Sequence, residues 1–143
     1  MARRFAPLAG LMPLVLAAVA GCGAATDHPA AELRRGLAAY QASAVNEPID
    51  ERENMARMAS AVRGIRRRGL VEAVPVLLDV VLLYDATDNP VAPAAWEAIV
   101  ELAPRSLDAI DRRISRCRDG GANDRSFLPV LERLRQDAAA GGS

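Results

Sequence analysis

The 143-residue sequence contains no lysine, only one histidine and two cysteines, and 3% of its residues are aromatic. All 18 basic residues are therefore arginines, and 18 acidic residues balance them, so that the formal net charge is zero. A chain without a basic excess lacks the electrostatic signature of nucleic-acid binding, and we expect no nucleic-acid partner. We interpret the absence of lysine as the coding bias of a GC-rich genome.

The sequence also lacks the residue patterns on which catalysis and metal binding usually depend. It has no glycine-rich phosphate-binding loop and no pair of histidines. His28 has no ligand-type residue at metal-binding spacing, which favours a solvated side chain over a metal ligand. The segment 85–90 lacks the spacing of a calcium loop and is typical of a turn with helix-capping residues. We therefore expect a protein that is not an enzyme and that holds no metal or cofactor.

The residues that are present favour helices, because 51% of them are hydrophobic and alanine and leucine dominate. The most apolar stretch is 71–84, in which Asp79 is the only polar side chain between Val74 and Leu83. Its length, its lack of glycine and the early Pro75 favour a buried central helix over a buried strand. The stretch is too short to span a bilayer, which needs about 20 residues.

Further helices are expected on both sides of this segment, because apolar residues recur there with helical spacing. Pro48 ends one such pattern at 46–48, and Gly69 is a helix stop after three arginines. Ser106 is expected to cap the helix that follows it, and 119–123 is expected to be a flexible loop. The expected flanking helices cover residues 31–43, 50–68, 91–102, 107–118 and 127–134.

Two side chains on these helices need an explanation. Asp79 is a carboxylate within a very apolar helix, and we expect it to form a salt bridge with Arg63 or Arg113. Cys117 lies on the apolar side of 107–118, which favours a small hydrophobic residue over a reactive thiol or an intermolecular disulfide.

Eight arginines form two groups, Arg63/Arg66/Arg67/Arg68 and Arg112/Arg113/Arg116/Arg118. In the second group Asp108 precedes Arg112 by four residues, so this face is expected to pair with itself in solvent. The first group has fewer acidic neighbours and is a candidate for contact with anionic lipid head groups or an acidic protein surface. Tryptophan and arginine are enriched at interface hot spots. The predicted partner-binding residues are therefore Trp96, Arg63, Arg66 and Arg67.

The first 21 residues have the three parts of a secretory signal peptide: a positive start, an apolar core and a small-residue end. They end in Val19-Ala20-Gly21-Cys22, which resembles the lipobox of bacterial lipoproteins, although leucine is more typical at the position of Val19. The resemblance implies cleavage between Gly21 and Cys22, diacylglycerol on the Cys22 thiol and an acyl chain on the new amine. An ordinary secretory signal cut near Ala25 is the alternative.

An internal repeat is the next most informative pattern. The apolar residues of 61–65 recur in 98–102 at an offset of 37, and Val74 and Leu77 recur 33 residues later. Pro75-Val76-Leu77 recurs as Pro129-Val130-Leu131, in what we expect to be a third, incomplete unit.

Paired helices at this spacing resemble HEAT-type α-solenoid repeats. Residues 91–100 follow the first-helix pattern of short HEAT-like units and depart from it at Ala92 and Val100. The resemblance implies an all-α, short solenoid of antiparallel helix pairs. A generic antiparallel helical bundle is the alternative.

These patterns predict a signal peptide at 1–21, a lipidated cysteine with a tether at 22–30, a helical domain at 31–139 and a flexible tail at 140–143. Removing 21 of 143 residues leaves 122, enough for a modest core, and changes the net charge to −2 because Arg3 and Arg4 are lost. We expect a lipoprotein of the cell envelope, anchored to membrane lipid through Cys22, and Gly23 favours the outer membrane.

The expected role is a non-catalytic adaptor or scaffold for another envelope protein, whose identity the sequence does not reveal. A pilotin-like chaperone of a larger envelope component is the alternative within this class. Two alternatives come from other functional classes. One is a small-ligand carrier or weak enzyme with a pocket between helices, and the other is a structural surface lipoprotein without a dedicated partner.

Overall fold

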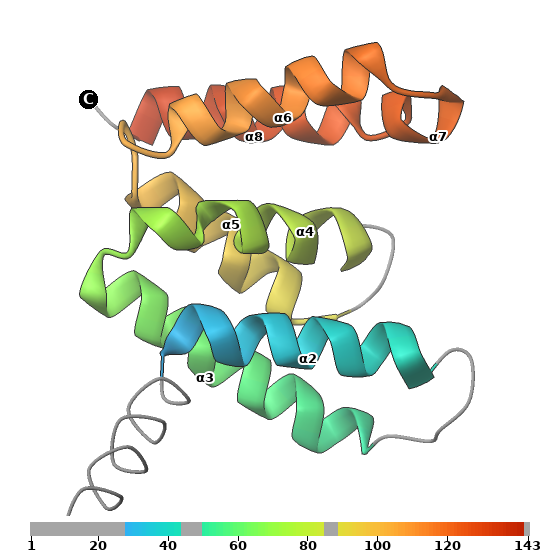
Figure 1. Cartoon of the computed structure of the whole chain (residues 1–143). Helices are drawn as coiled ribbons and strands as arrows, with labels where there is room; N and C mark the ends of the chain where they lie inside the picture. Colours follow the sequence, from blue (N-terminus) through green and yellow to red (C-terminus); the bar gives the residue numbers. More distant parts are fainter. Residues whose placement is uncertain (1–27, 44–49, 85–88, 142–143) are drawn as a thin grey trace, which may run out of the picture.

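The computed structural model describes residues 28–43, 50–84 and 89–141, and these residues form helices and no strand (Figure 1). The predicted all-α class is therefore confirmed. None of the helices within the described ranges is both long and apolar enough to cross a membrane. The elements in chain order are α2 (Pro29–Ser43), α3 (Glu51–Arg68), the 3-10 helix η1 (Val71–Ala73), α4 (Val74–Tyr84), α5 (Val91–Glu101), α6 (Leu107–Asp119), the short α7 (Ala122–Arg125) and α8 (Leu128–Gly141).

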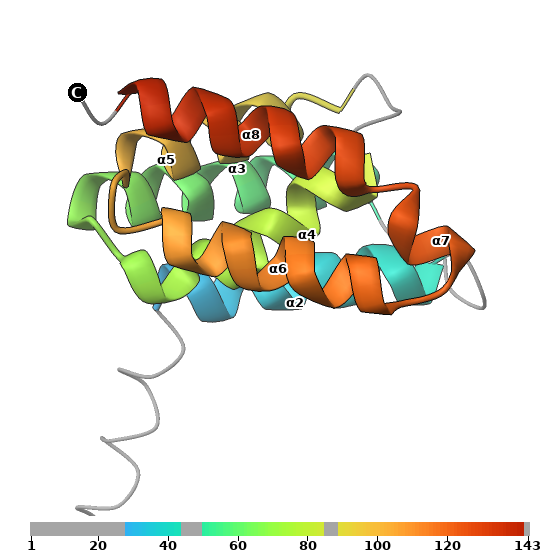
Figure 2. The ribbon, with the colours of Figure 1, turned by 90° about the horizontal axis from the view of Figure 1, so that it is seen from above.

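The six longer helices form three antiparallel pairs that are stacked on one another (Figure 1). The pairs are α2 with α3, α4 with α5, and α6 with α8. In the view from above, α2, α4 and α6 form one layer and α3, α5 and α8 form the other (Figure 2). Each pair buries its inner surface against the next, so that one continuous core runs through the stack.

Helix α4 occupies the middle of the stack and contacts α2, α5 and α6. All of its residues are buried except Pro75, Asp79 and Leu83. Burying a Val or Leu side chain contributes about 1.5–3 kcal/mol, so this helix supplies a large share of the hydrophobic stabilisation. The predicted central helix is confirmed, although its first three residues, Val71–Ala73, form the tighter η1 turn.

Both ends of α3 have a clear local cause. The Asp50 carboxylate accepts a hydrogen bond from the Glu53 backbone N–H at 3.0 Å and caps α3. Gly69 ends α3 in the left-handed conformation with φ of 63°, as its sequence position predicts.

Two predictions about helix ends are only partly right. Ser106 occupies the predicted N-cap position of α6, but it makes no side-chain capping bond, because its hydroxyl is fully buried and donates instead to the Ile99 carbonyl at 2.9 Å. The expected flexible loop at 119–123 is shorter than predicted, because α7 begins at Ala122 and the Gly121 N–H donates to the Asp124 carboxylate.

The domain limits also differ slightly from those expected. Helix α2 begins at Pro29, within the predicted tether, and α8 continues to Gly141, within the predicted tail. Pro29 and Ala30 are buried, so they belong to the folded domain. Several predictions lie outside the described residues: the signal peptide with its Gly21–Cys22 cleavage site and lipidated Cys22, the break at 46–48, the turn residues 85–88 and the end 142–143.

The arrangement changes the interpretation of the repeat. The sequence match related α3 to α5 and α4 to α6, and each of these pairs does lie side by side in one layer (Figure 2). The packed hairpins are nevertheless α2/α3 and α4/α5, and not the predicted units α3/α4 and α5/α6. The match of Pro75-Val76-Leu77 with Pro129-Val130-Leu131 relates α4 to α8, which lie in opposite layers, so it marks no structural equivalence. Membership of the HEAT-type repeats stays a prediction.

Candidate functional site

An open groove of about 750 Å³ lies on the α2/α4/α6 layer. On α2 and on α4 its wall residues are spaced three or four positions apart, so each helix presents one continuous face to the groove. The residues lining the groove are Arg34, Leu37, Ala38 and Gln41 of α2, Pro75, Val76, Asp79, Leu82 and Leu83 of α4, Arg113 of α6, and Phe127.

The floor of this groove is apolar. Leu37, Val76 and Leu82 retain only 7%, 3% and 9% of their exposure, while Leu83 and Phe127 are half-buried. Concave apolar surfaces with a few polar groups at the edge are typical of binding sites, and grooves between helices commonly accept an amphipathic helix.

Charged side chains lie at the edges of the groove. The Arg113 guanidinium donates to the Asp79 carboxylate, which confirms the predicted salt bridge and selects Arg113 over Arg63. Asp79 is 48% exposed and Arg113 is 23% exposed, so the pair contributes at most about 1 kcal/mol to stability. Arg34 on the α2 side is exposed and forms no ion pair with any residue that the structure describes. It is available to an acidic group of a bound partner.

Trp96, a predicted partner-binding residue, lies on a different part of the surface. Its ring is half-buried, its indole N–H donates to the Asp137 carboxylate at 3.0 Å, and the Arg133 guanidinium carbon lies 6.0 Å from the ring centroid. These contacts hold Trp96 against α8. A hollow of about 350 Å³ beside it is lined by Val81, Tyr84, Ala92, Pro93, Glu97, Arg133 and Asp137 as well as Trp96.

The three predicted partner-binding arginines of α3 are not equivalent. Arg66 donates to the Glu101 carboxylate and lies 3.5 Å from Glu97, so it joins α3 to α5. The hydrogen bond with Glu101 raises the pKa of Arg66 above its usual value. Arg63 and Arg67 are exposed and make no ion pair within the described ranges. Only these two are available to a partner.

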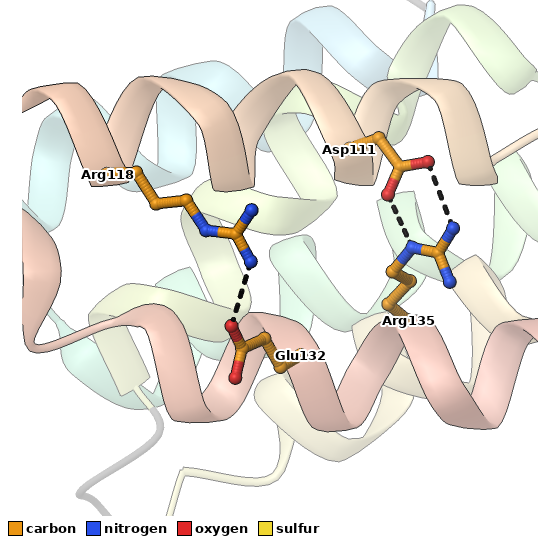
Figure 3. A network of polar contacts seen from close by, with 4 residues as sticks. All are labelled: Asp111, Arg118, Glu132 and Arg135. Atoms are coloured by element: carbon orange, nitrogen blue, oxygen red, sulfur yellow. Dashed lines mark hydrogen bonds and ion pairs between the residues drawn. The ribbon is translucent and has the colours of Figure 1, made fainter.

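The second group of arginines follows the prediction only in part, because Arg113 pairs with Asp79 of α4 and Arg116 makes no ion pair with the described residues. Arg112 pairs with Asp108 one turn earlier on the same helix. Figure 3 shows two further pairs that join α6 to α8: Arg118 with Glu132 at 3.2 Å, and Arg135 with both oxygens of Asp111. Local spacing does not predict these cross-helix pairs, because they depend on how two distant segments are aligned.

Three further features bear on reactive and metal-binding chemistry: the one described cysteine, groups of metal-ligand side chains, and buried polar atoms. Cys117 is buried on the core side of α6, which agrees with the predicted hydrophobic role. In the part of the chain that the structure describes, no three His, Cys, Asp or Glu side chains are grouped as a metal site would require. Each buried side-chain nitrogen or oxygen there has a hydrogen-bond partner.

Comparison of the chain with protein-family models, curated proteins and solved structures finds no match.

Proposed function

We propose that this chain is a bacterial lipoprotein, anchored through Cys22, that acts as a non-catalytic adaptor by binding another envelope protein in the α2/α4 groove. The proposal rests mainly on the open groove itself, whose wall includes the partly exposed apolar side chains of Leu83 and Phe127 above a floor of buried core residues. The lipobox-like Val19-Ala20-Gly21-Cys22 supports the anchor and the location.

The shape and charge of the groove suggest what it binds. Its two long walls are the faces of neighbouring helices in one layer, so a third helix can pack between them by the same side-chain interdigitation that joins α2 to α4. The floor requires apolar side chains on that helix. Arg34 is exposed at one edge without an ion pair to the described residues, so it can bind a carboxylate there. The occupant is therefore an amphipathic helix of an envelope protein with an acidic residue beside its apolar face.

Charge reversal at the groove edge tests this proposal. Arg34→Glu should reduce co-purification of the partner from crosslinked cells about tenfold, because it replaces an attraction with a repulsion at the interface. Arg116→Glu is the matched control, since Arg116 is exposed on α6 and does not line the groove. Equal recovery with both variants, each with an unchanged helical circular dichroism spectrum, would contradict binding in the groove.

A further inference from the structure

Helix α3 has an uneven distribution of charge. Between Asn54 and Val71 the chain carries five arginines and no acidic residue. Two of the five are engaged: Arg57 pairs with Glu53, and Arg66 pairs with Glu101 of α5. The other three are exposed and make no ion pair with the residues that the structure describes; we call Arg63, Arg67 and Arg68 the basic surface.

The basic surface lies beside the point where the chain enters the folded domain. Because α2 and α3 are antiparallel, the start of α2 lies against the last turns of α3 (Figure 1). Pro29 packs on Gly64 so closely that a Cβ atom at Gly64 would lie 3.0 Å from the Pro29 Cγ. A shallow hollow of about 320 Å³ between the two helices is lined by Pro29, Glu32, Arg57, Ser60, Ala61, Gly64, Arg67 and Arg68. Its one acidic residue, Glu32, is paired with Arg35.

The distance from this hollow to a membrane is limited by covalent geometry. Pro29 is seven residues after Cys22, and a chain of seven residues spans at most about 25 Å. If Cys22 carries the lipid, as proposed above, the start of α2 cannot lie farther than this from the head groups. The α6/α8 pair lies at the opposite end of the stack (Figure 1). The basic surface is therefore on the membrane-proximal end of the domain.

We infer that the basic surface docks on anionic phospholipid head groups. Guanidinium groups bind phosphate oxygens with paired hydrogen bonds, and the hollow beside Arg67 and Arg68 gives a head group room between α2 and α3. Each arginine held near an anionic surface strengthens binding about fivefold, so three give roughly 100-fold. In this orientation the α6/α8 pair lies farthest from the membrane, and the α2/α4 groove remains accessible on the side of the stack.

Vesicle binding by the non-lipidated chain tests this inference. The probe is the chain from residue 22 with Cys22→Ser, mixed with vesicles of phosphatidylglycerol and phosphatidylethanolamine or of phosphatidylcholine alone. Binding should require phosphatidylglycerol and should weaken strongly with added salt. Arg67→Glu combined with Arg68→Glu should weaken it at least about 25-fold. The control is Arg116→Glu combined with Arg125→Glu, which changes the net charge equally at exposed positions of α6 and α7 and should weaken binding less than about threefold.

Three results would overturn the inference: no binding to phosphatidylglycerol vesicles, equal binding to neutral vesicles, or an equal loss in both double variants. The first would also be the result if the basic surface faces an acidic protein. Different experiments test the lipid-docking inference and the proposed anchor, so one can be disproved without the other. Cys22→Ala in cells tests the anchor alone, whereas the vesicle experiment contains no lipidated protein.

Discussion

Tyr84 is the last residue of α4, and its side chain is buried where α4 meets α2 and α3. Its ring centroid lies 4.9 Å from that of Tyr40, and its hydroxyl lies 3.9 Å from the Met58 sulfur. Burial, with a smaller contribution from Tyr40, raises the pKa of Tyr84 from its ordinary 10.0 to about 12.

This shift predicts a loss of stability at alkaline pH. In the unfolded chain Tyr84 loses its proton near pH 10, whereas in the folded chain it keeps the proton to about pH 12. Between these values the unfolded state binds fewer protons, so the free energy of unfolding should fall as the pH rises, by roughly 1–3 kcal/mol in total. The test is urea denaturation from pH 9 to pH 12. The absence of lysine from the chain keeps this pH range free of amine side-chain titration.

Tyr84→Phe removes the titrating group and should remove most of this pH dependence. A variant that loses stability as steeply as the parent between pH 10 and pH 12 would show that Tyr84 is not the cause.

Side-chain contacts between residues close in the sequence could be predicted, whereas contacts between distant segments could not. The Arg112–Asp108 pair follows from helical spacing alone, and the sequence narrowed the partner of Asp79 to two arginines. The Arg66–Glu101 bridge and the Arg135–Asp111 pair span 35 and 24 residues, so their alignment is set by helix packing that local spacing does not encode.

At the scale of elements, the helices themselves were largely predictable because their apolar stripes and end residues are local signals. Asp50 and Gly69 begin and end α3 as expected. The capping bond of Ser106 was mispredicted. Its hydroxyl can either cap α6 or donate to the Ile99 carbonyl, and the packing of the fold determines which of the two bonds forms.

The packing of α2 on α3 gives a second prediction. A Cβ atom at Gly36 would lie 2.4 Å from the Cγ of Met58, which is fully buried and cannot turn to solvent. Asn54 also donates to the Gly36 carbonyl at 3.0 Å and holds the two helices at this distance. Gly36→Ala should therefore lower the free energy of unfolding by about 1–2 kcal/mol, although alanine favours the helix by up to 1 kcal/mol.

Gly121→Ala is the matched control, because no atom lies within 4 Å of the position that its Cβ would occupy. Its free energy of unfolding, measured by urea denaturation, should change by less than about 0.5 kcal/mol. A Gly36→Ala variant as stable as the parent would mean that α2 and α3 are not in close contact at Gly36.

At the scale of the whole molecule, the sequence indicated the helical class and the central position of α4 but not the pairing of the helices. A sequence repeat at a constant offset indicates which helices occupy equivalent positions, as it does for α3 and α5. It does not indicate whether α3 forms a hairpin with α2 or with α4, because both helices are its neighbours in the chain. The groove was also not predictable, because it depends on the relative position of α2 and α4.

The proposed anchor predicts where the protein is found in the cell. Cys22→Ala removes the thiol that would carry the diacylglycerol, and two or more acyl chains are what make such attachment stable. The variant should therefore move from the membrane fraction to the soluble fraction, or remain unprocessed, in a bacterial host. Cys117→Ala, which changes only a buried thiol, should stay in the membrane fraction. Membrane attachment that is equally tight without Cys22 would rule out the lipid anchor.

Site-specific photocrosslinking in cells can show whether the α2/α4 groove holds an envelope protein. A photoreactive residue at position 38 lies in the wall of the groove, and one at position 136 lies on the exposed side of α8 outside it. We expect one envelope protein to crosslink from position 38 in near-stoichiometric amount, through a helix with an acidic residue, and the yield to fall about tenfold in the Arg34→Glu background. Crosslinks from position 38 only to lipid and to the protein itself, or the same products from position 136, would contradict the adaptor function.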